Sequence, residues 1–310
     1  MANESTTTTL TEMVRQAAYA KGVLYFSTKP GVSNFVAKMD ITGQPTLTAR
    51  FPIYDSVTAT AIAENTDFTT NSAVDTSGSV DVTVSEHAIR FIITTLALGA
   101  TVEEVLQPVP SPALAASAQA QGGIVGEMVA EALQTRQDKD ITALFASFDS
   151  STGSNTGAIT TTLFQTAITT LDSNNIPSMP RIAVLHPFQW GSLRVAFTNA
   201  ATYGTQVGED VIRRGITAQV LGVDIFATGN VGTATVSSST VYAGAMFHPS
   251  AVALATKGAL PEIASEYDAS LRAVEVVGTA VWGEAEYRGG ATTNGRGGAA
   301  VFLYSNSTVA

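Results

Sequence analysis

Few side chains in this 310-residue chain could carry out acid–base, nucleophilic or metal chemistry. Three histidines occur, His87, His186 and His248, and the last two each stand directly before a proline. Helical zinc motifs pair histidines at a fixed spacing, commonly with a glutamate beside them. Because no such spacing is present, we interpret His186 and His248 as turn residues whose rings bond locally. We interpret His87, beside Glu86, as part of a strand irregularity, and we predict no metal site.

Carboxylate pairs stand at three places in the sequence, and glycosidases use two carboxyl groups that face each other across a cleft. The pairs are Glu103–Glu104, Glu209–Asp210 and Glu284 with Glu286. Adjacent positions do not establish such a geometry, so we interpret the pairs as solvated charge. There is no G-x-S-x-G motif, and the glycine-rich segments 229–232 and 289–298 lack the lysine of a phosphate-binding loop. Cysteine is absent, which removes thiolate chemistry. The sequence predicts no catalytic residue and no cofactor.

The charge balance argues against broad nucleic-acid contact. Lysine and arginine number 16 against 26 acidic residues, a net charge of −10, whereas affinity for nucleic acid comes from basic residues that neutralise phosphates. We interpret the one basic pair, Arg213–Arg214, as solvated or salt-bridged surface and not as a nucleic-acid site. Only 14% of the residues are charged, well below the usual quarter, which favours a surface covered by neighbouring subunits. The apolar run 91–100 is too short to span a bilayer and no signal peptide begins the sequence, so we expect no membrane partner.

Residues 46–97 predict two long β arms joined by a polar tip. Apolar side chains alternate in the first arm and again in the return arm, with a slip in phase near Glu86–His87 that indicates a β-bulge. The apolar positions are Leu47, Ala49, Phe51 and Ile53, then Val80, Val82 and Val84, then Ile89, Phe91 and Ile93. Arms of about fifteen residues reach about 50 Å, which carries the hairpin beyond a compact subunit. An isolated hairpin is marginal in water, so we expect its apolar face to pack on another subunit.

The other elements follow from apolar periodicity and from turn residues. We predict a short helix at 10–19, an extended connection at 22–43 and one long helix at 113–145. A linker at 149–157, rich in Ser, Gly and Asn, marks a domain boundary. Beyond it we expect helices at 161–171, 187–197 and 250–255, strands at 182–185, 241–247 and 299–304, and one or two strands within 271–287.

This order of elements resembles that of tailed-bacteriophage major capsid proteins. Two phrases add to the resemblance, Val184-Leu185-His186-Pro187 and the segment from Ala245 to Ala255 that contains His248-Pro249. The resemblance implies an α+β fold, the phage major-capsid-protein fold. Its parts are an extended β-hairpin called the E-loop, a long spine helix, a discontinuous peripheral domain and an α/β axial domain.

The resemblance also implies a division of the chain. Residues 1–45 form the N-terminal arm, 46–97 the E-loop, 98–157 the peripheral domain with the spine helix, 158–255 the axial domain, and 256–310 the returning strands of the peripheral domain. Some members of the family weld an E-loop lysine to a neighbour through an isopeptide bond. No lysine lies between Lys38 and Lys139 here, so we expect the hold on neighbours to be non-covalent.

The function that the resemblance implies is structural. The chain assembles with itself as hexamers and pentamers into an icosahedral virion shell, built in the host bacterial cytoplasm, around double-stranded DNA that it does not bind in a sequence-specific way. The implied partners are a separate scaffolding protein, a portal and a decoration protein. Three alternatives stay open: an encapsulin-like nanocompartment, a tail-tube or other β-rich virion protein, which the long helix disfavours, and an enzyme with an unrecognised site.

Overall fold

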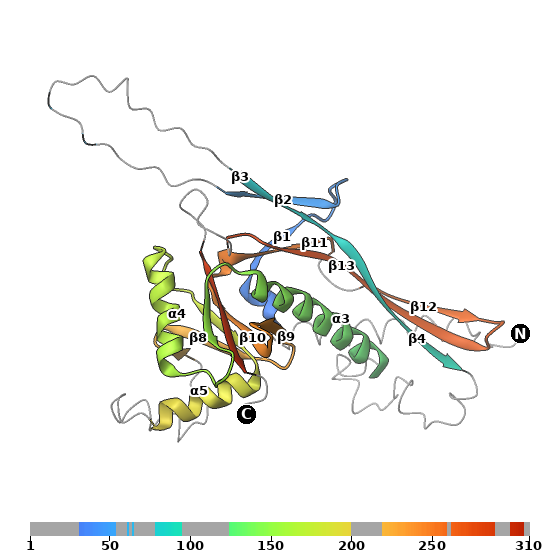
Figure 1. The fold of residues 1–310 in the computed structure, drawn as a ribbon. Coiled ribbons are helices and arrows are strands. Elements are labelled where there is room, and N and C mark those ends of the chain that lie inside the picture. The colour runs from blue at the N-terminus through green and yellow to red at the C-terminus, as the bar shows by residue number, and fades with distance from the viewer. Residues whose placement is uncertain are drawn as a thin grey trace, which may run out of the picture.

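The computed structural model describes residues 31–53, 61, 64, 78–94, 124–199, 219–258, 262–288 and 298–306. Several predictions lie outside these residues: the helix at 10–19, the tip of the hairpin, the start of the long helix, Glu103–Glu104, Glu209–Asp210 and Arg213–Arg214. The described part contains two larger sheets and a two-stranded hairpin (Figure 1). Its helices include none that is long and apolar enough to cross a membrane.

A seven-stranded sheet forms the first unit. Its order is β5-β14-β10-β6-β8-β7, with β9 paired to β10. The strands are β5 (Ser151–Ser154), β6 (Ile182–Leu185), β7 (Gln219–Val220), β8 (Val223–Ala227), β9 (Thr233–Val236), β10 (Ser239–Phe247) and β14 (Ala300–Asn306). All four residues of β6 are buried, as a central strand covered on both faces requires.

Helices α4 (Thr161–Ser173) and α5 (Pro187–Asn199) connect the strands of this sheet. Thr160 caps α4 by accepting a hydrogen bond from the backbone N–H of Leu163, and Pro187 occupies the first turn of α5, where its missing N–H costs nothing. Both helices bury an apolar side toward the unit: Phe164, Ala167 and Leu171 from α4, and Trp190, Leu193 and Phe197 from α5.

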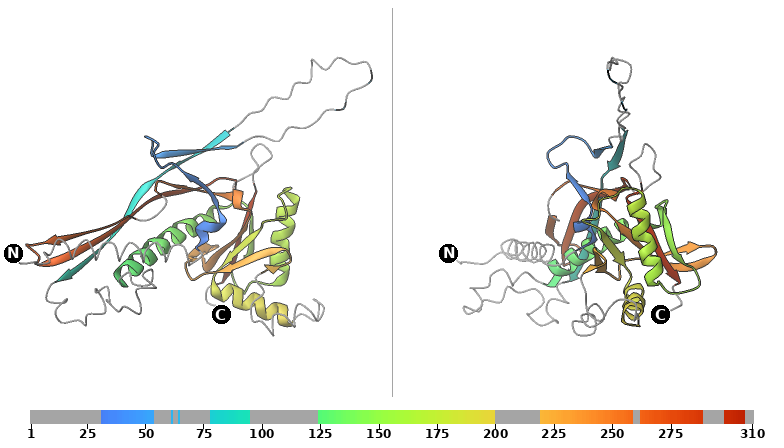
Figure 2. Two further views of the ribbon diagram at one scale, coloured as in Figure 1. Left: turned by 180° about the vertical axis from the view of Figure 1, so that it is seen from behind. Right: turned by 90° about the vertical axis from the view of Figure 1, so that its left-hand side faces the viewer.

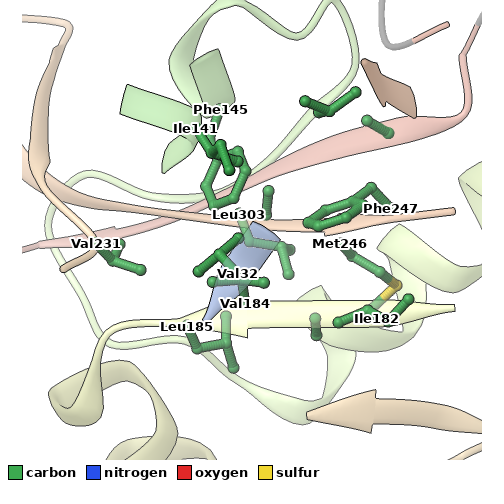
Figure 3. Close-up of a cluster of buried hydrophobic side chains, with 14 of the residues drawn as sticks. Val32, Ile141, Phe145, Ile182, Val184, Leu185, Val231, Met246, Phe247 and Leu303 are labelled. Carbon is green, nitrogen blue, oxygen red and sulfur yellow. The ribbon is translucent and has the colours of Figure 1, made fainter. Parts of the chain in front are cut away.

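The main hydrophobic core lies beside this sheet and draws on distant segments (Figure 3). Val32 enters from a short 3₁₀ helix, η1 (Val32–Phe35), and Ile141 and Phe145 come from the end of the long helix α3 (Ile124–Ala143) and from η4 (Leu144–Ser147). They meet strand residues such as Phe247 and Leu303. Each fully buried large side chain contributes about 1.5–3 kcal/mol, so the core joins the N-terminal arm to the helix and the sheet.

A second, five-stranded sheet extends away from the first unit as a long arm (Figure 2). Strand β13 (Ala273–Glu286) pairs with β4 (Ser85–Thr94) on one side and with β11 (Val252–Thr256) and β12 (Glu262–Asp268) on the other, while β1 (Ala37–Asp40) joins β11 in parallel. Helix α3 contacts β13 and β4. A Cβ added at Gly278 would lie 2.1 Å from Cγ1 of Val129, so only glycine allows this close approach of helix and strand.

The base of the predicted hairpin is present as β2 (Thr48–Ile53) paired antiparallel with β3 (Gly78–Thr83). Its inner side chains, Ala49, Phe51, Val82 and Val84, join Ile41 and residues of β11 in a second small core. The expectation that the apolar face rests on another subunit is therefore wrong for this described base, which packs on its own chain. Leu47, expected on the same face, precedes the strand and is 56% exposed.

The return arm differs from the prediction beyond Thr83. The strand breaks at Val84, two residues before the expected slip at Glu86–His87, and continues as β4. From Ser85 to Thr94 it pairs with β13 and not with the first arm. The change of partner accounts for the change of phase, because Val80, Val82 and Val84 face one core whereas Ile89 and Phe91 pack against the other.

Two further predictions are corrected by the structure. Residues 250–255 are not a helix, since η5 (Pro249–Ala251) leads into strand β11, which is paired on both sides by β1 and β13. The predicted linker 149–157 contains strand β5, which pairs in parallel with β14. Segment 271–287 forms the single strand β13, and the helices and strands expected at 161–171, 182–185, 187–197, 241–247 and 299–304 are confirmed to within a few residues.

Candidate assembly surface

The three histidines lie in different parts of the fold. Nδ1 of His186 accepts a hydrogen bond from the backbone N–H of Phe188 at 3.3 Å, and Nδ1 of His248 accepts one from that of Ser250 at 3.2 Å. These contacts confirm the interpretation of both as turn residues with local bonds. His87 lies on β4, within hydrogen-bonding distance of Oγ of Ser85. Burial lowers the pKa of all three rings.

Glu284 and Glu286 point from the same side of β13, two residues apart, so they do not face each other across a cleft. Burial raises the pKa of both carboxyl groups, and the charge of Asp140 raises that of Glu284 further. Oγ of Ser147 donates to Oε2 of Glu286 at 3.1 Å. Among the residues that the structure describes, no group of His, Cys, Asp and Glu is arranged to hold a metal ion.

A buried carboxylate that the sequence analysis missed fixes the N-terminal arm. Oδ1 of Asp138, in α3, accepts a hydrogen bond from the backbone N–H of Val32 at 2.8 Å, and its Oδ2 accepts one from Nδ2 of Asn230 at 3.2 Å. A Cβ at Gly31 would lie 2.8 Å from Nε2 of Gln134 and 2.9 Å from Oδ1 of Asp138. The signal in the sequence was the acidic residue itself, three residues before Ile141 on the apolar side of the helix.

The base of the hairpin is held at a defined angle to the arm of the second sheet. The hydroxyl of Tyr287 donates to the backbone carbonyl of Pro52, and the rings of Tyr287 and Phe51 lie 5.6 Å apart. On the outer side, Nε of Arg50 lies 2.8 Å from Oδ1 of Asp81 in an exposed ion pair, which solvent and salt screen. Buried Phe51 and half-buried Tyr287 thus anchor the base of the hairpin, whose strands β2 and β3 run across the end of the second sheet (Figure 1).

The second sheet presents an acidic outer face on the side away from α3. Exposed or half-exposed side chains alternate there along three strands: Glu86, Ala88, Arg90 and Ile92 on β4, Glu275 on β13, and Glu262, Ala264 and Glu266 on β12. Arg90 pairs with Glu275 across the strands. This face of the described sheet therefore carries mostly acidic and small side chains.

Comparison with known proteins bears on the fold. No protein-family model and no curated protein matches the sequence. Solved structures match over almost the whole chain. A capsid structure of Helicobacter pylori bacteriophage KHP30 gives a TM-score of 0.65 at 12% identity, covering 90% of this chain and 92% of that chain. The capsid structure of the cyanophage P-SCSP1u gives 0.63 at 15%, covering 90% and 89%. The chain has the bacteriophage capsid fold.

Two further solved structures also match over more than nine-tenths of both chains. A structure described as Mycobacterium phage Che8 gives a TM-score of 0.57 at 18% identity and covers 91% of this chain and 93% of that chain. A virus-like particle from Pyrococcus furiosus gives 0.51 at 10%, covering 94% and 98%. The fold predicted from the order of elements is confirmed. In terms of the capsid fold, β2 and β3 are the base of the E-loop and α3 is the spine helix.

Proposed function

We propose that this chain is a structural shell protein, which assembles as hexamers and pentamers into an icosahedral container for the double-stranded DNA of a tailed phage. The observation that carries the proposal is the likeness to phage capsid structures over about nine-tenths of both chains. Because the identity is low, that likeness supports a shared architecture, and the function follows from what such an architecture is built to do. No catalytic step is part of the proposal.

The work of the protein is mechanical in this proposal. The spine helix α3 and the arm of the second sheet form a rigid support, because Gly278 brings strand and helix into direct contact. The E-loop, anchored through Phe51 and Tyr287, reaches a neighbouring subunit, and the N-terminal arm, anchored at Asp138, ties subunits together. These contacts are non-covalent, since the sequence from Lys38 to Lys139 contains no further lysine.

We propose that each domain corresponds to one of the two larger sheets and that its segments are not contiguous in the sequence. The axial domain consists of the seven-stranded sheet with α4 and α5, and it includes β5 and β14, which the predicted boundaries 98–157 and 256–310 assign to the peripheral domain. The peripheral domain consists of α3 and the five-stranded sheet, and it includes β4 and β11. The E-loop proper then begins at β2 and ends at Thr83, where β3 ends.

The proposed setting is the virion, with assembly in the host bacterial cytoplasm. A separate scaffolding protein, a portal and a decoration protein are the proposed partners, and the packaged DNA is enclosed without sequence-specific contacts. The test is assembly of the purified full chain, alone and with a co-expressed scaffolding protein, followed by size-exclusion chromatography and negative-stain electron microscopy. We expect closed shells tens of nanometres across. A monomer in every condition would contradict the proposal.

A nanocompartment that encloses protein cargo is the second candidate, and the match to the virus-like particle from Pyrococcus furiosus favours it. The two functions predict different contents for particles isolated from the native source. A phage capsid yields nuclease-protected double-stranded DNA, whereas a nanocompartment yields a co-purifying protein and no protected genome. Neighbouring terminase and portal genes would also support the phage assignment.

A further inference from the structure

The two larger sheets are joined directly by a short link and by helix α3. Strand β10 ends at Phe247 and β11 begins at Val252, so the link 248–251, which contains η5, passes from one sheet to the other. Helix α3 contacts β13 and β4 of the second sheet, and it also contacts η1 and β10 (Figure 1). A few residues of a link can absorb a rotation between two rigid parts. A helix that is fixed to both sheets therefore sets the angle between them.

The contact of α3 with the second sheet is apolar. Val129 and Leu133 are buried, and Val129 lies where a Cβ on Gly278 would be. Apolar packing of this kind stabilises the contact, but cores that are held by apolar packing alone lose a unique arrangement before they lose stability. This half of the helix is thus attached firmly to the five-stranded sheet, and the other half must provide the direction.

The end of α3 nearest the seven-stranded sheet is held by polar groups. Oγ1 of Thr142 lies 3.0 Å from the carbonyl oxygen of Asn230 and 3.1 Å from that of Lys139, so its proton is shared between them. Asn230 belongs to the turn between β8 and β9, and its Nδ2 donates to Oδ2 of Asp138 at 3.2 Å. Asp138 and Thr142, one turn apart on the helix, are 4% and 2% exposed. One helix therefore holds Asn230 by both its backbone and its side chain.

The N-terminal arm enters at the same place. The backbone N–H of Val32 donates to Oδ1 of Asp138 at 2.8 Å, and the ring of Phe35 lies 5.2 Å from that of Phe226 on β8. Burial raises the pKa of Asp138, while hydrogen bonds from Asn230 and from two backbone N–H groups oppose this effect. Among the described residues, the donors to this carboxylate are neutral N–H groups. Directed hydrogen bonds, and not a cation, hold the buried charge.

The polar groups at the end of α3 limit its orientation. We call Asp138, Thr142 and Asn230 the α3 joint. Hydrogen bonds weaken steeply as their angles depart from the ideal, and a buried polar network whose members are satisfied makes the surrounding structure rigid. A rotation of α3 against the β8–β9 turn would break these bonds inside the protein, where water does not replace them. The α3 joint therefore favours one orientation of the helix on the seven-stranded sheet.

We infer that the α3 joint fixes the angle between the five-stranded and seven-stranded sheets, and through that angle the curvature of the shell. The second half of this inference rests on the proposed function. When identical copies meet through two different surfaces, the rotation from one copy to the next decides whether the assembly closes. That rotation depends on the shape of each copy. A variable angle inside the subunit would therefore give particles of variable size.

The first test measures the angle in the full-length chain, kept below the concentration at which it assembles. The chain contains no cysteine, so Thr235→Cys on β9 and Ala264→Cys on β12 together place one spin label on each sheet. Both positions are exposed. Double electron–electron resonance gives the distribution of distances between the labels. We expect a single narrow distribution with the intact joint, and one at least about twofold wider when the joint is broken.

Two substitutions break the α3 joint with little change in volume. Thr142→Val removes the hydroxyl group, and Asn230→Asp replaces the amide donor by a carboxylate that repels Asp138 at pH 7. Thr233→Val and Asn175→Asp are the matched controls, because they make the same changes at exposed positions. Circular dichroism shows whether each variant is folded, and the milder Thr142→Val decides the result if Asn230→Asp does not fold. Distance distributions as narrow in the folded joint variants as in the controls would overturn the inference.

The second test examines the shells by negative-stain electron microscopy. The wild type and the controls should give one diameter, whereas the folded joint variants should give a spread of diameters at least about threefold broader. Shells of uniform wild-type size, from variants whose label distances are spread, would overturn the link between the joint and curvature. If the wild type forms no shell, the proposed function fails. The label distances then still decide whether the α3 joint fixes the angle between the sheets.

Discussion

The ring of His87 lies parallel to that of Trp282, with centroids 3.9 Å apart and an interplanar angle of 11°. His87 belongs to β4 and Trp282 to β13, so the stack fastens the return arm of the predicted hairpin to the second sheet. Trp282 is buried. The contact explains why this arm does not remain paired with β2: beyond Val84 it gains an aromatic partner and the apolar side of the sheet that covers α3.

The same stack predicts a loss of stability in acid. Burial lowers the pKa of His87 from its ordinary 6.5, with Arg136 adding to the effect and Asp140 opposing it. The unfolded chain therefore binds more protons as the pH falls below about 6.5, and the free energy of unfolding decreases. His87→Phe keeps the stacking and removes the titration. We expect urea midpoints at pH 7 and pH 5 to differ less in this variant than in the wild type. If the midpoints of the variant differ between pH 7 and pH 5 as much as those of the wild type, His87 is not the group responsible for the loss of stability in acid.

Glu284 predicts the opposite dependence on pH. Burial and the nearby charge of Asp140 raise its pKa above the ordinary 4.5. The folded state then holds a proton that the unfolded state releases, so this group weakens the fold as the pH rises above about 4.5. Glu284→Gln should raise the melting temperature at pH 8 and change it little at pH 4. The control is Glu262→Gln, which alters an exposed carboxylate on the same sheet and should have no effect at either pH.

Asp138 is predicted to be the strongest polar contributor to the anchoring of the N-terminal arm. Asp138→Ala leaves the buried N–H of Val32 without an acceptor and should cost about 2–3 kcal/mol of the free energy of unfolding, measured in urea on the unassembled chain. Asp138→Asn keeps an oxygen acceptor, so its cost should be smaller. Equal losses in the two variants would mean that the charge, and not the hydrogen bond, stabilises the anchor.

The contact of Gly278 with Val129 can be tested as a pair. Gly278→Ala adds a methyl group 2.1 Å from Cγ1 of Val129 and should destabilise the chain by about 1–3 kcal/mol. Val129→Ala removes the obstacle at its own cost of about 2 kcal/mol, because two buried carbon atoms are lost and a cavity is left. The double variant should therefore be nearly as stable as Val129→Ala alone. Additive losses in this double-mutant cycle would show that the glycine is needed for another reason.

Elements that carry their own pattern could be predicted from the sequence. Strand β6 was located to the residue because its four positions are apolar and lie between turn signals, and α5 was found through Pro187. Strand β5 could not be found, since Ser151–Ser154 has no apolar alternation. It is a strand because its backbone pairs with β14. Gly153 permits this pairing, since a Cβ at that position would lie 2.1 Å from the backbone carbonyl oxygen of Tyr304.

Partners distant in sequence account for the other differences. Residues 252–256 are alanine-rich and read locally as a helix, but hydrogen bonds to β1 on one side and β13 on the other make them a strand. Strand β4 was expected as a strand, but its pairing with β13, almost two hundred residues away in sequence, could not be predicted. The role of Asp138 could not be predicted either, because the groups that donate hydrogen bonds to its carboxylate belong to Val32 and Asn230, each about one hundred residues distant in sequence. Local pattern does not encode such pairings.

The E-loop gives the last prediction, which separates folding from assembly. Replacing residues 54–77 by a two-residue Asn-Gly turn keeps β2 and β3 paired, because such a turn suits a tight hairpin. The second small core around Phe51 and Val82 stays intact, so the chain should remain soluble and keep its melting temperature within a few degrees. Shells should be absent in negative stain, since the reach to a neighbour is lost. The control is Arg50→Ala, which breaks only an exposed ion pair and should assemble like the wild type. Particles of normal size from the shortened chain would show that the loop is not required.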